Sequence, residues 1–122
     1  MNYEFERQIR RNTRLFLAKD NWGGNDVFVK LAKIKGDKIP WHNHKLEDEL
    51  FYVIEGELLF ELEGENPFHL KQGELFIVPR GVNHKVSATE ECSILLIENK
   101  TTAHTGDVQS EVTKSVEEQY FR

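Results

Sequence analysis

Two histidines separated by a single residue, His42 and His44, are the first side chains in the sequence that could do chemistry together. On an extended strand, residues two apart project from the same face, about 6.7 Å apart along the strand, so both imidazoles could reach one ion. Glu49 follows five residues later and opens the apolar run 50–54, where a bend would carry it onto a neighbouring strand. The segment is therefore a candidate metal site that combines imidazole and carboxylate ligands.

A third histidine, His84, could complete this site from a distant part of the sequence. It ends the segment GELFIVPRGVNH, residues 73–84, in which a strand-like run is followed by a turn containing Pro79 and Gly81. Antiparallel pairing around a barrel could bring His84 to the same interior point. Three neutral imidazoles and one carboxylate suit iron, manganese, nickel, copper or zinc, and they leave coordination positions open for substrate, water or dioxygen.

The elements that must position these groups are short strands. Turn signals recur throughout the chain, among them Asn-Trp-Gly-Gly at residues 21–24, and runs rich in Val, Ile, Leu and Phe lie between them. Many short strands at a spacing of roughly 8–12 residues are typical of an all-β sandwich or barrel. We expect strands at residues 14–18, 27–34, 50–54, 57–62, 75–78, 85–87 and 93–97.

Helical signals are confined to the two ends of the chain. Within residues 3–18, a short helix could lead into the first strand. The tail 107–122 carries three valines and a tyrosine at intervals of four, which permits one packed helical stripe. A frayed tail is the alternative for this segment.

Length and composition bound the class of protein. A chain of 122 residues suits one domain, and its net charge of −5 argues against nucleic acid or an anionic membrane as a partner. The single cysteine excludes an internal disulfide framework and fits a reducing compartment. The longest apolar run is too short to cross a bilayer, and the charged N-terminal residues lack the apolar region of a secretory signal. We therefore expect one cytoplasmic domain over residues 1–122, with a barrel core at about 26–100 and extensions at 1–25 and 101–122.

Taken together, these residues resemble the two sequence motifs of the cupin superfamily, in particular its small single-domain members of the cupin 2 type. The first motif is Gly, five residues, His-x-His, three or four residues, Glu, six residues, Gly. The chain matches it at every position, with Gly36, His42, His44, Glu49 and Gly56.

The second motif is Gly, five residues, Pro-x-Gly, two residues, His, three residues, Asn. The chain matches it with Gly73, Pro79, Gly81 and His84, and has Ala88 in place of the usual Asn. Sixteen residues, 57–72, separate the two motifs, as in compact members of the superfamily. Because Ala88 lies outside the ligand set, the departure concerns the geometry of a turn rather than the metal.

The resemblance implies both a fold and a site. The implied fold is a double-stranded β-helix, a jelly-roll barrel with the site in its mouth. Carried over residue by residue, the implied ligands of a divalent transition metal ion (Fe, Mn, Ni or Zn) are His42, His44, Glu49 and His84. The resemblance also implies a homodimer and a small-molecule ligand.

Other residues near the motifs have structural interpretations. Glu47 and Asp48 are expected to be solvated loop acids, although either could replace Glu49 as a ligand if the bend falls earlier. We expect His69 to lie on the surface. Cys92 precedes an apolar strand, and we expect a buried small side chain there rather than a nucleophile.

Aromatic and rim residues complete the set of candidates. Trp41 alternates with His42 and should face away from the metal. Arg80 could attract an anionic substrate at the barrel rim, but we favour a solvated turn cation. His104 matches no ligand motif. Core or dimer-interface packing is expected for the remaining aromatic residues, Phe51, Tyr52, Phe60 and Phe76.

Two classes of function fit this site. The first is a metal-dependent enzyme that acts on a small molecule, by oxygenase chemistry or by isomerase or lyase steps in which the metal stabilises an enolate. Glu49 is then a candidate catalytic base as well as a ligand. The second is a non-catalytic cupin that binds a small metabolite or metal as a sensor or carrier, and a scaffold for dimerisation is a third option. We favour the enzyme; the sequence names no substrate.

Overall fold

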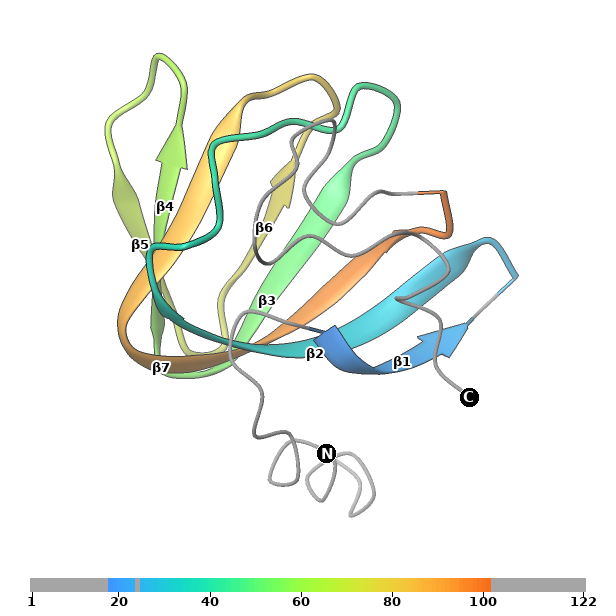
Figure 1. Ribbon diagram of the computed structural model, residues 1–122, viewed down its shortest axis with the longest axis horizontal. Helices are drawn as coiled ribbons and strands as arrows, with labels where there is room; N and C mark the ends of the chain where they lie inside the picture. Colours follow the sequence, from blue (N-terminus) through green and yellow to red (C-terminus); the bar gives the residue numbers. More distant parts are fainter. Residues whose placement is uncertain (1–17, 24, 102–122) are drawn as a thin grey trace.

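The computed structural model describes residues 18–23 and 25–101, and within these residues it contains seven strands and no helix (Figure 1). The strands are β1 (Ala18–Gly23), β2 (Val27–Gly36), β3 (Glu49–Glu55), β4 (Glu57–Leu62), β5 (Phe68–Lys71), β6 (Leu75–Val78) and β7 (His84–Asn99). The prediction of an all-β fold is confirmed. No helix in the described part of the chain is long and apolar enough to cross a membrane.

Strand β7 joins the two parts of the curled antiparallel sheet. Its first residues pair with β4, from His84 to Ser87, and β4 also pairs with β5. Beyond Ala88, the same strand lies between β2 and β3 and pairs with both. The resulting order is β1-β2-β7-β3-β6, with β4 and β5 beside the other half of β7 (Figure 1). This topology is consistent with the predicted double-stranded β-helix.

The curvature of β7 brings its two ends toward the same place. Glu98 follows His84 by fourteen positions, which would span roughly 46 Å in a straight strand. Glu49 nevertheless meets both residues: its carboxylate lies 3.4 Å from His84 Nε2, and its backbone pairs in register with Glu98. The strand therefore wraps around the barrel rather than crossing it.

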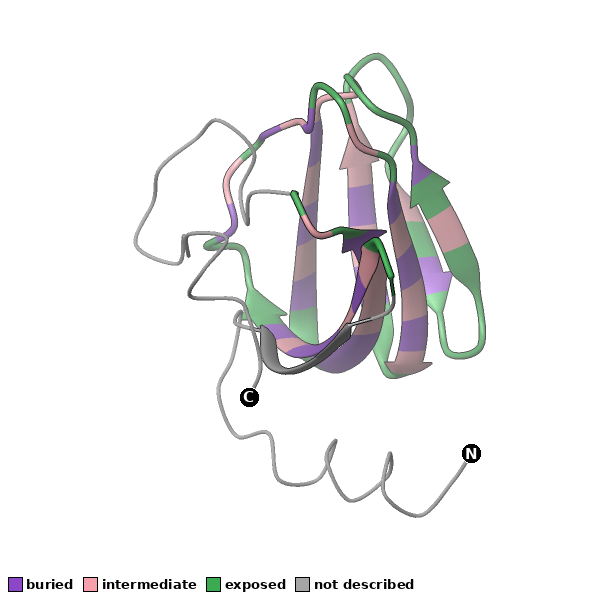
Figure 2. Cartoon of the chain, turned by 90° about the vertical axis from the view of Figure 1, so that its right-hand side faces the viewer, coloured by how far each residue is buried: buried purple, intermediate pink, exposed green. Residues whose placement is uncertain are grey.

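Alternating side chains of the strands fill the barrel with an aromatic core. Along β3 and β4, buried and less buried residues alternate, which appears in Figure 2 as stripes across the strands. Phe51 on β3 meets Phe60 on β4 edge to face with ring centroids 4.8 Å apart, and Phe60 stacks on Phe68 at 5.4 Å. Burial of aromatic side chains of this size is the main stabilising contribution in a domain of this length.

Gly56 makes the tight connection between β3 and β4. Its φ of +94° lies in the region that residues with a side chain rarely adopt. A Cβ at this position would lie 3.0 Å from both Cys92 Cα and the carbonyl oxygen of Glu91. Only glycine satisfies both constraints, which explains why a glycine closes the first motif.

The observed strands differ from the sequence predictions in three places. The first described strand is Ala18–Gly23, so the turn predicted at residues 21–24 is wrong for Asn21, Trp22 and Gly23; the strand predicted at 14–18 lies outside the described residues except for Ala18. These three residues pair with β2, because the ladder to a long neighbouring strand outweighs their local turn preference. The four-residue strand β5 was not predicted; only Leu70 in it is buried, so its apolar signal is weak.

The third difference concerns the strands predicted at 85–87 and 93–97, which form the single strand β7. The exposed residues Thr89, Glu90 and Glu91 interrupt the apolar pattern at the point where β7 passes from one part of the sheet to the other. The terminal helices predicted within 3–18 and 107–122 lie outside the described residues, except that Ala18 belongs to β1.

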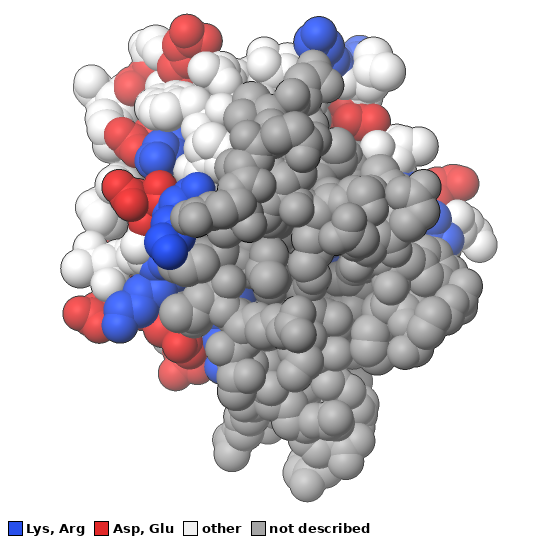
Figure 3. All heavy atoms as spheres, viewed as in Figure 1, with Lys and Arg blue, Asp and Glu red and all other residues white. Residues whose placement is uncertain are grey.

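The surface is mixed in charge. On the described part of the face shown in Figure 3, Lys and Arg side chains lie among Asp and Glu side chains. Such interspersed charges are typical of a solvated protein surface.

Candidate metal centre

His42 and His44 lie in the connection between β2 and β3, so the assumption that they sit on a regular strand is wrong. Strand β2 ends at Gly36 with φ +86°, and Pro40 has no amide hydrogen to continue a ladder. The alternation of side chains is nevertheless kept. Both histidines are buried, whereas Trp41 is 41% exposed and faces away, as the sequence predicts.

Backbone hydrogen bonds fasten this connection to the second motif. His42 and His84 form an isolated antiparallel bridge, in which each N–H donates to the other's carbonyl at 3.0 and 2.8 Å. The N–H of Gly81 donates to the His44 carbonyl at 2.8 Å. Gly81 has φ +80° and occupies the third position of a turn closed by a hydrogen bond from Val82 N to Pro79 O. Main-chain hydrogen bonds thus hold together residues that lie some forty positions apart in the sequence, in addition to any contacts between their side chains.

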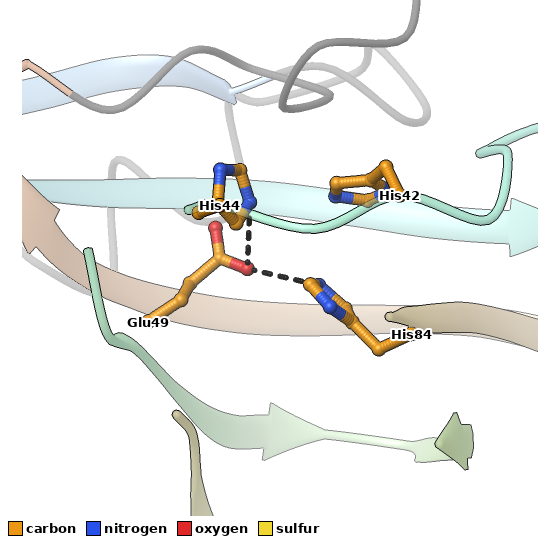
Figure 4. A group of neighbouring side chains, drawn as sticks. All are labelled: His42, His44, Glu49 and His84. Atoms are coloured by element: carbon orange, nitrogen blue, oxygen red, sulfur yellow. Dashed lines mark ion pairs between the residues drawn. The ribbon is translucent and has the colours of Figure 1, made fainter. Parts of the chain in front are cut away.

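The structure brings the four predicted residues into one buried group (Figure 4). Each residue offers one ligand atom, and these atoms all lie within 4.8 Å of one another. Glu49 Oε1 is 3.5 Å from His44 Nε2 and 3.4 Å from His84 Nε2. Ligands at about 2.0–2.2 Å from a shared metal ion are separated by roughly 3–4 Å, so the observed spacing is close to that of a coordination shell.

Hydrogen bonds to the main chain orient two of the three imidazoles. His42 Nδ1 lies 2.7 Å from the Pro40 carbonyl, and His84 Nδ1 lies 2.9 Å from the Val82 carbonyl. Because a carbonyl oxygen only accepts, each Nδ1 carries the proton and each Nε2 presents a lone pair. Histidines that bind metals almost always donate their other ring N–H in this way.

Several polar atoms of the group have no hydrogen-bond partner among the described residues. They are His44 Nδ1, His44 Nε2, Glu49 Oε1 and His84 Nε2, and all are buried. Leaving buried polar atoms unpaired is costly, and native proteins rarely do so without a compensating ligand. Three of these atoms face one another, so a cation between them would remove the cost. The group could hold a metal ion.

The electrostatics of the site favour neutral histidine and ionised glutamate. Burial lowers the pKa of His42 to about 4, against a hydrogen bond to Pro40 that raises it; the nearby His84 adds to the lowering. Burial alone would raise the pKa of Glu49, but the neighbouring imidazoles of His44 and His84 bring it well below its ordinary value. Both shifts favour the protonation states that metal ligands need.

A second buried pair of charged residues, Lys30 and Glu98, adjoins this group, and sequence reasoning missed it. The two side chains form an ion pair inside the barrel. Burial and the neighbouring carboxylate of Glu49 raise the pKa of Glu98 well above its ordinary value. Glu98 lies directly opposite Glu49 in the register of β3 and β7. Glu98 occupies an inward-facing position at the end of an otherwise apolar segment of β7. A charged residue at such a position is the sequence signal that could have identified this pair.

A pocket opens beside the two groups and is mostly apolar. Together with its mouth, it comprises about 490 Å³. The polar residues of its lining are His42, Glu49, Lys30 and Glu98. The apolar residues of the lining are Ala32, Ile34, Ile39, Phe51, Val86, Ile94 and Leu96.

The alternative carboxylates lie outside the group. Glu47 Oε2 accepts a hydrogen bond from the Thr101 hydroxyl at 2.9 Å, and Asp48 Oδ1 accepts one from the Arg80 N–H at 2.8 Å. Neither carboxylate therefore replaces Glu49. The second contact ties the residue before Glu49 to the turn of the second motif.

The remaining candidates are placed as follows. His69 is exposed, 3.9 Å from Glu57, and Arg80 is exposed in its turn. Cys92 is buried, and burial raises the pKa of its thiol to about 11, which is unfavourable for a nucleophile. Ala88 packs in the core, where a small apolar side chain fits. His104 lies outside the described residues.

Fold and site together define a small jelly-roll barrel with a possible metal centre. A family model described as the Cupin domain matches residues 32–98, which is more than half of the chain. The chain belongs to the cupin family.

Individual relatives agree with this assignment. The Bacillus subtilis (strain 168) protein YdbB is 36% identical over 76 residues, which cover 62% of this chain and 66%, just under two thirds, of YdbB. A crystal structure of a cupin-2 domain containing protein from Shewanella frigidimarina NCIMB 400 is 33% identical, with a TM-score of 0.74 over 81% of this chain and 93% of that one. Protein NMB1881 from Neisseria meningitidis is 21% identical, with a TM-score of 0.72 over 81% and 99% of the two chains, which shows a shared fold.

Proposed function

We propose that this cupin is a metal-dependent enzyme acting on a small molecule, with His42, His44, Glu49 and His84 as ligands of one divalent transition metal ion. The observation that carries the proposal is a set of buried ligand atoms, from His44, Glu49 and His84, that face one another without hydrogen-bond partners among the described residues. A structural role alone gives no reason to bury three imidazoles and a carboxylate in that arrangement.

When bound, such a metal supplies either a site for dioxygen or a Lewis acid for isomerase or lyase steps. The chain's own residues supply the rest of the chemistry. The main-chain contacts of His42 and His84 fix their rings, so that Nε2 of each points into the group. Glu49 stays ionised, and its carboxylate can accept a proton from a substrate held in the pocket.

The pocket supports a small substrate with an apolar body. Its lining is mainly apolar, and its polar residues include His42 and Glu49 of the candidate metal centre. A structure of DMSP lyases is 24% identical to this chain with a TM-score of 0.55, which shows the shared fold alone. The fold therefore does not identify the reaction, which has to be inferred from the residues of the site.

Metal content of the purified protein tests the site directly. The full chain is loaded in turn with Fe(II), Mn(II), Ni(II) and Zn(II), dialysed, and measured by elemental analysis. We expect about one ion per chain for the wild type and loss of at least tenfold in affinity for His84→Ala, because one ligand and its fixed lone pair are removed. His69→Ala, which alters an exposed histidine, is the matched control and should bind like the wild type. Equal and negligible metal in all three proteins would contradict the proposal.

Turnover separates an enzyme from a non-catalytic binder. Metal-loaded protein is assayed for oxygen consumption and, by NMR, for conversion of a panel of small carbonyl compounds and hydroxy acids. We expect conversion that His84→Ala abolishes and His69→Ala does not. Full metal occupancy with no conversion in either assay would favour a sensor or carrier.

A further inference from the structure

The side chain of Asp48 joins the segment of the first motif to the turn of the second. Its Oδ1 accepts a hydrogen bond from the Arg80 N–H at 2.8 Å, although 32 positions separate the two residues. Arg80 lies in the turn of residues 79–82, just before His84, and Asp48 directly precedes Glu49. The contact therefore links the two chain segments that carry these candidate ligands.

The register of β3 against β6 explains why a side chain makes this contact. Glu49 pairs with Val78 in the last pair of this ladder. The next position in the same register would place Asp48 opposite Pro79, and proline has no N–H to donate. The Asp48 carboxylate instead accepts from the next N–H along the chain, that of Arg80. It thus extends the pairing beyond the point where the main chain can continue it.

This extension lies at the start of β3, where Glu49 is the first residue of the strand. Terminal residues of an element open more easily than its interior, because fewer contacts hold them. To share a cation, Glu49 Oε1 has to stay close to His44 Nε2 and His84 Nε2, from which it is 3.5 and 3.4 Å away. A contact at the residue immediately before Glu49 opposes opening of the strand on the β6 side.

We propose that Asp48 is a positioning residue, whose hydrogen bond to the Arg80 N–H fixes Glu49 relative to His84. The inference rests on the proposed metal site and adds to it a residue that does not itself bind the metal. Asp48 is exposed, so removal of its side chain leaves the core intact. Its loss should therefore change the geometry of the site more than the stability of the fold.

A carboxylate near a cation can also act through its charge alone, and the neighbouring acid provides the comparison. Glu47 precedes Asp48 in the same connection and carries the same charge. Its Oε2, however, accepts a hydrogen bond from the Thr101 hydroxyl at 2.9 Å rather than from the turn of the second motif. Removal of either carboxylate changes the net charge equally, but only removal of Asp48 releases the Arg80 N–H.

The test compares full-length variants that keep or remove the acceptor. Asp48→Ala removes Oδ1, whereas Asp48→Asn removes the charge and keeps an oxygen that can accept from the Arg80 N–H. Glu47→Ala is the matched control for loss of a carboxylate from the same connection. Urea unfolding in the presence of a chelator establishes that each variant folds.

Co(II) is the probe of the site. Its affinity is determined by competition with a chromophoric chelator, and the visible absorption of the Co(II)-loaded protein reports coordination geometry. Loss of a contact made directly to a ligand typically weakens metal binding by about 10–100-fold. Asp48 acts one residue away, so we expect about tenfold weaker binding and a changed spectrum for Asp48→Ala. Asp48→Asn and Glu47→Ala should keep the wild-type spectrum and an affinity within about threefold of wild type.

Amide hydrogen exchange, followed by NMR in the metal-free protein, detects the contact itself. The Arg80 amide should be protected in the wild type and in Asp48→Asn, and it should exchange faster in Asp48→Ala. An unprotected Arg80 amide in the wild type would overturn the proposal, whether or not Asp48→Ala folds.

The other outcomes have distinct meanings. Wild-type affinity and spectrum in Asp48→Ala would overturn the positioning role and leave the metal site intact. Equal losses of affinity in Asp48→Ala and Asp48→Asn, or in Asp48→Ala and Glu47→Ala, would also overturn it, because charge rather than the hydrogen bond would then be responsible. Absence of Co(II) binding by the wild type itself would refute the proposed metal site, and the positioning role with it.

Discussion

His42 is a histidine that the fold keeps neutral. Its ring is buried, its Nδ1–H is committed to the Pro40 carbonyl, and its pKa falls to about 4. A neutral ring is what a metal requires, since a proton on Nε2 would block the lone pair. The same shift makes the metal-free protein sensitive to acid.

The sign of that sensitivity follows from the two pKa values. Unfolded His42 takes up a proton near pH 6.5, whereas folded His42 does so near pH 4, so between these values the unfolded chain binds more protons. The contribution to stability is intact above pH 6.5 and is lost as pH falls toward 4. For the metal-free protein, we expect the free energy of unfolding to drop by roughly 2–3 kcal/mol between pH 7.5 and pH 4.5 through this residue alone.

Urea unfolding in the presence of a chelator measures this loss. His42→Gln cannot titrate, so its stability should depend on pH less steeply than that of the wild type by about that amount. His69→Gln, at an exposed histidine, should follow the wild type. An identical pH dependence in all three proteins would show that His42 is not held neutral by the fold.

At the scale of elements, the site depends on turns as much as on strands. The first motif ends at Gly56, where β3 turns into β4 against the backbone of residues 91 and 92. Gly64, in the turn after β4, has a similar φ of +83°, but a Cβ there would have nothing within 4 Å. Alanine at Gly64 would therefore introduce backbone strain alone, whereas alanine at Gly56 would introduce backbone strain and steric contact together.

This difference predicts unequal effects of alanine at the two positions. Gly64→Ala should lower the free energy of unfolding by about 1 kcal/mol, the cost of a left-handed conformation for a residue with Cβ. Gly56→Ala should lower it by about 2–4 kcal/mol, because the new Cβ also meets Cys92 Cα and the Glu91 carbonyl at 3.0 Å. Thermal and urea unfolding of the two variants measure the difference. Equal losses of unfolding free energy would mean that the backbone at residues 56, 91 and 92 shifts at little cost to accommodate the new Cβ.

At the scale of the whole molecule, strand β6 exposes large apolar side chains at an edge of the described sheet. Among the described residues it pairs only with β3, so its other edge is unpaired there. Leu75 and Ile77 alternate on it and are 59% and 48% exposed. Large apolar side chains on an edge strand are unfavourable in water and favour association. We propose that this strand forms the interface of a homodimer.

Light scattering coupled to size-exclusion chromatography tests the interface. The wild type should elute with twice the chain mass of 14.3 kDa, and Leu75→Lys/Ile77→Lys should elute as a monomer. Leu46→Lys is the control, since Leu46 is 77% exposed but lies in the connection before β3. A monomeric wild type, or a dimeric double variant, would contradict the proposed interface.

The four members of the candidate site were predictable because their signal is local. Glycine and proline occur in the sequence where turns require them. The spacing of His42, His44 and Glu49 is a property of one short segment. Strands of regular apolar pattern, such as β4 and β6, were predicted with the bounds that the structure shows. The family resemblance then linked this segment to His84.

The residues behind the site were decided only by tertiary structure. Each face of β2 carries both apolar residues and lysine, so alternation alone cannot tell that Lys30 points inward while Lys33 reaches a surface glutamate. The meeting of Glu98 with Glu49 depends on the register of β7 against β3, which is fixed by contacts far apart in the sequence. Residue types and spacing thus determined which groups can bind a metal, whereas the curvature and pairing of β7 decided what holds them in place.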